Sequence, residues 1–139
     1  MNMQLRPHHT AISVRNLDKS LNFYKTLGFK EVHRYNEPDG SMSIVHLKLS
    51  ESFLEIFAYK NNENLQELQY GFANEPENIG VKHIALRTDD IEATLKELKG
   101  LGLADKETQI TEGRTKVRYF FIKDPDGVWV ELIKDDRYD

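Results

Sequence analysis

The apolar and polar positions of the first half of the chain predict a strand, a helix and then three strands. Residues 8–14 alternate in polarity, as a half-buried strand does. Residues 17–27 carry apolar side chains at helical spacing, with Asn16 or Asp18 as the N-cap and Gly28 where a helix commonly ends. Strand-like segments follow at about 30–35, 43–49 and 53–59. The first half is therefore predicted to be a βαβββ module.

The second half shows the same order of elements. A strand is expected at 82–87, then a helix capped by Asp89 or Asp90 and ended by Gly102, then strands at about 105–110, 116–123 and 128–134. An open four-stranded sheet with one buried face needs a partner, which the other half supplies. We expect an α+β fold in which two tandem βαβββ modules form a paired, barrel-like cleft. The domain would span 1–139, with module one at 5–60, a linker at 61–80 and module two at 81–135.

The two halves also match residue by residue. Laying 9–29 over 83–103 without gaps places His9 on His83, and Glu55 and Glu131 occupy matching places later in each half. Equivalent positions of a duplicated unit that closes on itself meet near its pseudo-twofold axis. Two imidazoles and two carboxylates suit a divalent metal such as nickel, cobalt or zinc, and four ligands leave room for water. We therefore predict a metal site formed by His9, Glu55, His83 and Glu131.

Taken singly, these residues have simpler interpretations. A lone glutamate between aliphatic residues on a strand is usually solvated, and a lone strand histidine is more often a hydrogen-bonded core or edge residue. Recurrence in register favours the site, because an outward-facing residue has no reason to recur. His8 is expected on the face opposite His9, as a structural residue. His33 and His46 have no repeat partner that is His or Glu, so surface or core positions are expected for both.

Composition limits the possible partners. The chain has 139 residues, 30% of them charged and 39% hydrophobic, which suits one globular domain with a real core. The net charge of −4 and the lack of a basic stripe with aromatics argue against nucleic acid. No apolar run is long enough to span a bilayer, and residues 1–7 lack the apolar core of a signal peptide. Without cysteine there is no disulfide or thiolate ligand, and the cytoplasm is the default location.

Several motifs resemble the glyoxalase / bleomycin-resistance / extradiol-dioxygenase superfamily, also called vicinal oxygen chelate proteins. The most distinctive is Asp-Pro-Asp-Gly at 124–127 followed by Glu131-Leu132; the others are His-Thr-Ala-Ile at 9–12, Leu-Asn-Phe-Tyr at 21–24, Phe-Leu-Glu-Ile at 53–56 and Val-Lys-His-Ile-Ala-Leu at 81–86. The resemblance covers nearly the whole chain. The ligand order His, Glu, His, Glu is similar to that of bacterial glyoxalase I, the metal-dependent lactoylglutathione lyase.

This resemblance implies a lyase or isomerase that acts on the hemithioacetal of a 2-oxoaldehyde and a thiol. The metal would stabilise an enediolate, and a carboxylate beside it would move the proton between neighbouring carbons. The matching family glutamate makes Glu131 the first choice for this base and Glu55 the second. The resemblance also implies a small-molecule substrate and a homodimer.

The positions that hold glutathione in the family differ here. The resemblance places an Arg and an Asn where this chain has Ser13 and Tyr59, and neither supplies a cationic fork for a carboxylate. Another thiol or a different oxyanion substrate is therefore an alternative. The residues that could bind an anionic substrate are Arg114, Lys116 and Arg118. Their simpler interpretation is that they belong to a solvated strand edge.

Three other activities remain open at this point. The first is thiol transfer to an electrophile, as in fosfomycin resistance, which needs no second glutamate. The second is metal-free sequestration of a small molecule, as in bleomycin resistance, which needs no ligands. The third is a ferrous 2-His-1-carboxylate oxygenase.

Overall fold

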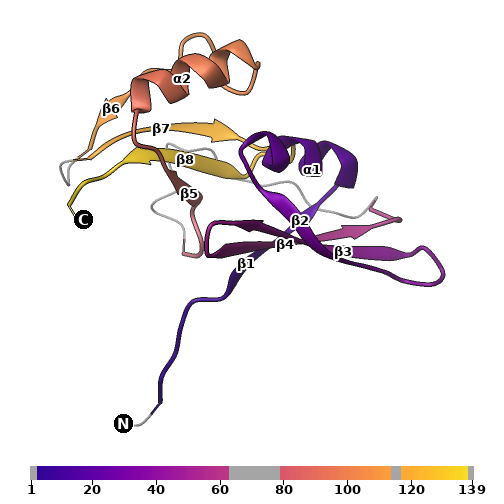
Figure 1. The fold of residues 1–139 in the computed structure, drawn as a ribbon. Helices are drawn as coiled ribbons and strands as arrows, with labels where there is room; N and C mark the ends of the chain where they lie inside the picture. Colours follow the sequence, from indigo (N-terminus) through magenta and orange to yellow (C-terminus); the bar gives the residue numbers. More distant parts are fainter. Residues whose placement is uncertain (1–2, 63–78, 114–116, 138–139) are drawn as a thin grey trace. The chain divides into compact units, whose positions relative to one another are not determined.

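The computed structural model describes residues 3–62, 79–113 and 117–137. The chain divides into two compact units, Met1–Gln66 and Glu67–Asp139. Within the described residues, each unit has one helix and a four-stranded sheet, and Figure 1 shows these elements in sequence colours. The predicted βαβββ order is confirmed in both halves.

The first unit has the strand order β1-β4-β3-β2, with β1 parallel to β4 and the other neighbours antiparallel. The first and last strands of the module are therefore neighbours, and β1 and β2 are the two edges of an open sheet. The elements are β1 (His9–Val14), α1 (Leu17–Thr26), β2 (Lys30–Asn36), β3 (Met42–Leu49) and β4 (Ser52–Tyr59).

The second unit repeats this topology, with the strand order β5-β8-β7-β6 and a parallel β5–β8 pair. It is also an open sheet, so neither sheet closes into a barrel. Helix α2 packs against β7 and β8 (Figure 1). The elements are β5 (Ile84–Arg87), α2 (Ile91–Gly100), β6 (Thr111–Glu112), β7 (Arg118–Lys123) and β8 (Trp129–Lys134).

Alternation along the last strand of each module separates a buried face from the face of the candidate site. In β4, Leu54 and Ile56 are 2% and 0% exposed, and in β8 Val130 and Leu132 are 0% and 4% exposed. Neighbouring side chains on a strand point to opposite faces. The glutamates between these aliphatic residues therefore lie on the opposite face, as the sequence predicted.

Both helices begin and end as the sequence indicates. The Asn16 side chain accepts a hydrogen bond from the backbone N–H of Lys19, and Asp90 does the same for Ala93, each at 3.0 Å. Each cap satisfies a backbone donor that has no partner within the helix. Gly28 (φ 108°) and Gly102 (φ 75°) follow the helices in a backbone conformation that residues with a Cβ rarely adopt.

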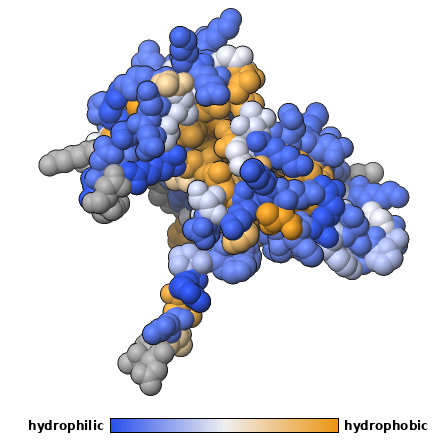
Figure 2. Space-filling model, viewed as in Figure 1, coloured by the Kyte–Doolittle hydropathy of each residue, from blue (hydrophilic) through white to orange (hydrophobic). Residues whose placement is uncertain are grey.

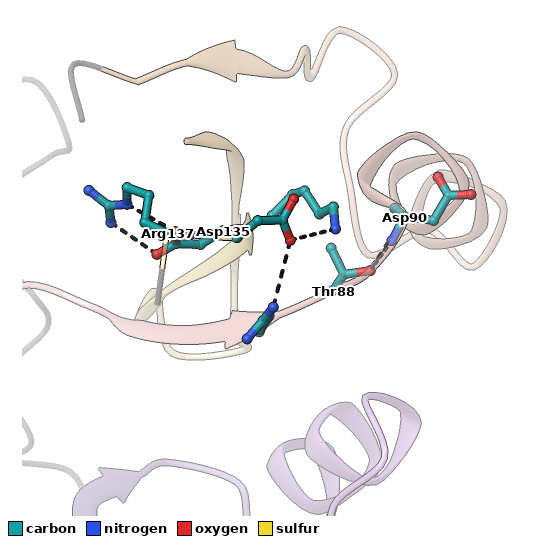
Figure 3. Close-up of polar contacts among 7 residues, drawn as sticks. Thr88, Asp90, Asp135 and Arg137 are labelled. Atoms are coloured by element: carbon teal, nitrogen blue, oxygen red, sulfur yellow. Dashed lines mark hydrogen bonds and ion pairs between the residues drawn. The ribbon is translucent and has the colours of Figure 1, made fainter. Parts of the chain in front are cut away.

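Charged residues hold the segment that follows β8. The Arg137 guanidinium binds both carboxylate oxygens of Asp135 at 2.9 Å, and this contact lowers the pKa of Asp135 to about 2. Figure 3 shows this pair and also the start of α2, where the backbone N–H of Asp90 donates to the Thr88 hydroxyl at 3.3 Å. The Asp135–Arg137 contacts thus give the chain ordered structure beyond the end of β8.

One predicted strand is wrong. Residues 105–110 form no strand, and pairing begins only at β6. The backbone N–H of Thr108 donates to the carbonyl of Asp105 at 3.1 Å, which closes a turn at Lys106 and Glu107. Lys and Glu are poor strand formers, and this turn leaves a short edge strand.

The described helices include none that is both long and apolar enough to cross a membrane. Figure 2 shows a visible surface that is mostly hydrophilic on each unit, with hydrophobic residues in patches.

Candidate metal-binding residues

The first unit brings His9 and Glu55 together through the parallel pairing of β1 and β4. Glu55 pairs with Ala11, and His9 precedes Ala11 by two residues, so His9 and Glu55 share one face of the sheet. The His9 Nε2 lies 3.7 Å from the Glu55 Oε1. The Glu55 side chain is 19% exposed, so its carboxylate is partly withdrawn from water. The two candidate ligands of the first module are therefore neighbours.

His8 differs from the sequence expectation. It precedes β1, so strand alternation does not fix its direction, and its ring stacks on Phe53 with centroids 5.7 Å apart. The Nδ1 atoms of His8 and His9 lie 2.8 Å apart. A hydrogen bond at Nδ1 leaves the His9 Nε2 directed at Glu55, which is how ligating histidines are commonly held. His8 is therefore in contact with a candidate ligand, contrary to the sequence prediction.

His46 is a residue of this face that sequence reasoning missed. It pairs with Glu55 across β3 and β4, and its Nε2 lies 2.6 Å from the Glu55 Oε2. Its own neighbour across β2 and β3 is His33, with ring centroids 5.6 Å apart. The signal was present in the hairpin: a two-residue turn at 50–51 fixes the register that sets His46 opposite Glu55.

The second unit brings His83 and Glu131 together in the equivalent way. His83 precedes β5, and its Nε2 lies 2.8 Å from the Glu131 Oε2. Glu131 is one of the few buried polar residues in the described part of the chain, with 12% of its side chain exposed. Its cross-strand neighbour is Phe121, whose ring packs edge-on against His83 at 5.2 Å. Trp129 packs against Phe121 in turn, at 5.8 Å.

The chemistry and spacing of each pair fit a divalent metal. Two ligands bound at about 2.1 Å and at right angles lie about 3 Å apart. The 2.8 Å separation of His83 and Glu131 matches this spacing, and the 3.7 Å separation of His9 and Glu55 corresponds to a wider angle. Among the described residues, no three His, Asp or Glu side chains form a group suited to hold a metal ion. Each unit thus contributes a pair, and the joining of the two pairs stays a prediction.

Of the three residues predicted to bind an anionic substrate, only Arg118 lies within the described residues. Arg114 and Lys116 lie outside the described residues. The Arg118 guanidinium contacts Glu92 of α2 at 2.5 Å and Glu112 of β6 at 2.9 Å, and the Glu92 contact is the main cause of its raised pKa. Arg118 is three residues from Phe121 on β7, so it lies on the face opposite Glu131. These contacts tie Arg118 to its own module.

Tyr59 lies at the end of β4 and helps to line an open pocket of about 610 Å³. It is four residues beyond Glu55, so it belongs to the same face of the sheet. The pocket mixes one cation with one carboxylate and several neutral polar groups; its lining is Asp39, Ser41, Tyr59, Lys60, Asn61 and Asn62. No arginine fork for a carboxylate is among these residues.

Two βαβββ modules, each with a His–Glu pair on one sheet face, define a duplicated α+β protein with a candidate metal site. Residues 6–132 match the model of the Glyoxalase/Bleomycin resistance protein/Dioxygenase superfamily. The chain belongs to this superfamily.

The relatives are of modest identity. The chain is 32% identical over 134 residues to the uncharacterized protein YwbC of Bacillus subtilis, with 95% of this chain and 99% of YwbC covered. It is 32% identical over 130 residues to a probable lactoylglutathione lyase of Vibrio cholerae, with 91% and 88% covered. A solved glyoxalase family protein from Enterococcus faecalis has a TM-score of 0.75 at 28% identity, with 93% of this chain and 97% of that chain covered.

Proposed function

We propose that this protein is a metal-dependent lyase or isomerase of the glyoxalase I type. The observation that carries the proposal is the recurrence, in both modules, of a histidine Nε2 facing a partly buried glutamate. Relatives named lactoylglutathione lyase support the same activity. In this proposal His9, Glu55, His83 and Glu131 bind one divalent ion, nickel, cobalt or zinc.

The substrate in this proposal is the hemithioacetal of a 2-oxoaldehyde and a small thiol. A bound divalent ion supplies the positive charge that lowers the energy of an enediolate. Glu131 takes the carbon-bound proton and returns it to the neighbouring carbon, so the reaction is an isomerisation with no net gain or loss of protons. The aromatic residues beside Glu131 support this role, because a dry environment strengthens the interactions of a carboxylate. Ser13 and Tyr59 favour a thiol other than glutathione.

The first test is metal content. Protein purified without chelators, or reconstituted with nickel, cobalt or zinc, is expected to hold about one ion per chain, and the His83→Ala variant is expected to lose it. The loaded protein should then convert methylglyoxal in the presence of one member of a panel of thiols. Absence of metal under every condition would refute the enzyme and leave a sequestering protein.

A pair of glutamate variants separates the enzymatic alternatives. Glu131→Gln is expected to reduce kcat by about 10²–10⁴-fold, which is the usual contribution of a general base. Glu55→Gln should also impair isomerisation, because it weakens a ligand. Thiol transfer to an epoxide that survives Glu55→Gln would instead favour a thiol transferase.

A further inference from the structure

The structure points to a difference between the two modules beside the glutamates. The cross-strand neighbour of Glu55 is His46, whereas that of Glu131 is Phe121. These two neighbours occupy equivalent places in the two sheets, because each faces the glutamate from the antiparallel strand next to it. One glutamate therefore has a hydrogen-bonding neighbour and the other has an aromatic one.

Each oxygen of the Glu55 carboxylate faces a different imidazole. The Oε1 lies 3.7 Å from the His9 Nε2, and the Oε2 lies 2.6 Å from the His46 Nε2. A carboxylate only accepts hydrogen bonds, so the His46 Nε2–H is the donor. Among the described residues, Glu131 has one such contact, to His83, and its cross-strand neighbour is Phe121, whose ring packs against His83. Within the described part of the chain, Glu55 therefore has an imidazole facing each oxygen, with the hydrogen bond coming from His46, whereas Glu131 has a single imidazole.

We propose that His46 is a positioning residue that holds Glu55 in place through a hydrogen bond from Nε2 to Oε2. This inference rests on the proposed function in one respect: it assigns Glu55 to fixed ligation and leaves Glu131 as the carboxylate that moves the proton. A base that also binds the metal must loosen when substrate arrives, and among the described residues Glu131 has fewer polar contacts to break than Glu55. His46 therefore removes the near-equivalence that the sequence repeat gives to the two glutamates.

The first experiment needs no metal. Long-range ¹H–¹⁵N NMR spectra of the metal-free protein, at mildly alkaline pH, report which ring nitrogen of His46 carries the proton. The Nε2–H form is expected to predominate, and Glu55→Ala should shift His46 towards a mixture of both tautomers. Glu131→Ala is the matched control and should leave His46 unchanged. A His46 tautomer that is indifferent to Glu55 would overturn the proposal, whether or not the protein binds metal.

The second experiment measures cobalt affinity by calorimetry and by visible absorption. His46→Phe, which copies the neighbour found in the second module, should weaken cobalt binding by about 10–100-fold, the usual effect of losing a residue that orients a ligand. His46→Gln keeps an N–H near the Nε2 position and should retain affinity within a few-fold, with an unchanged cobalt spectrum.

His33→Phe controls for changes to this face, because His33 neighbours His46 and no contact joins it to Glu55 among those the structure gives. It should bind cobalt as the unaltered protein does. Tight binding by His46→Phe, or equal weakening in His46→Gln, would overturn the positioning role. A protein that binds neither cobalt, nickel nor zinc in any form would refute the proposed function, and the NMR result would still decide the role of His46.

Discussion

At the scale of single residues, the duplicated sequence allows one module to serve as the reference for the other. Ser20 and Thr94 are repeat equivalents near the start of α1 and α2. Ser20 is 0% exposed, and its hydroxyl meets no hydrogen-bond partner within the described part of the chain. The Thr94 hydroxyl lies 2.7 Å from the Asp90 carbonyl and 2.6 Å from the Thr88 hydroxyl. The same position is therefore satisfied in one module only.

This difference predicts opposite effects of alanine on stability. Ser20→Ala should leave the free energy of unfolding unchanged or raise it by about 1 kcal/mol, because it removes a buried polar group without a partner. Thr94→Ala should lower it by about 1 kcal/mol, because it removes hydrogen bonds. Urea denaturation measures both. A clear loss of stability in Ser20→Ala would show that its hydroxyl has a partner in solution.

At the scale of elements, the two helix ends offer a second comparison. A Cβ added to Gly102 would meet no atom within 4 Å, whereas one added to Gly28 would lie 3.3 Å from the Leu49 Cδ1. Both glycines have positive φ, which costs a residue with a Cβ about 1–2 kcal/mol. Gly102→Ala should lower the free energy of unfolding by about that amount, and Gly28→Ala by more, because Leu49 must also move. Equal losses in urea denaturation would contradict the contribution of the Leu49 contact.

Most elements could be predicted from the sequence, because amphipathic periodicity, caps and turn residues agree in both halves. The turn at 105–108 could not, since the hydrogen bond from the Thr108 N–H to the Asp105 carbonyl closes it in a segment whose pattern suggested a strand. The His–Glu pairs followed from the repeat. His46 was not predicted to lie at the site, because a search for repeat partners overlooks a residue that occurs in one module only. The register of the β3–β4 hairpin could have identified it.

At the scale of the whole molecule, the proposal that four residues share one ion has a thermodynamic consequence. A metal that binds only the native state stabilises it by about 2.7 kcal/mol at a free concentration of 100 times its Kd. His9 and His83 belong to different units. If both units hold the same ion, His9→Ala and His83→Ala should each abolish the whole metal-dependent rise in Tm. If the two units bound metal independently, each variant would lose only part of the metal-dependent rise in Tm. Thermal unfolding with and without nickel distinguishes the two cases.

The parallel pairing of the first and last strands in each module also orders events during synthesis. Strands β2 and β3 can form their hairpin as soon as they leave the ribosome, because their contacts are local. His9 is synthesised early, but the strand that brings Glu55 beside it is the last of its module. The second pair waits for β8 in the same way. A nascent chain therefore cannot form either His–Glu pair until the last strand of the corresponding module has been made.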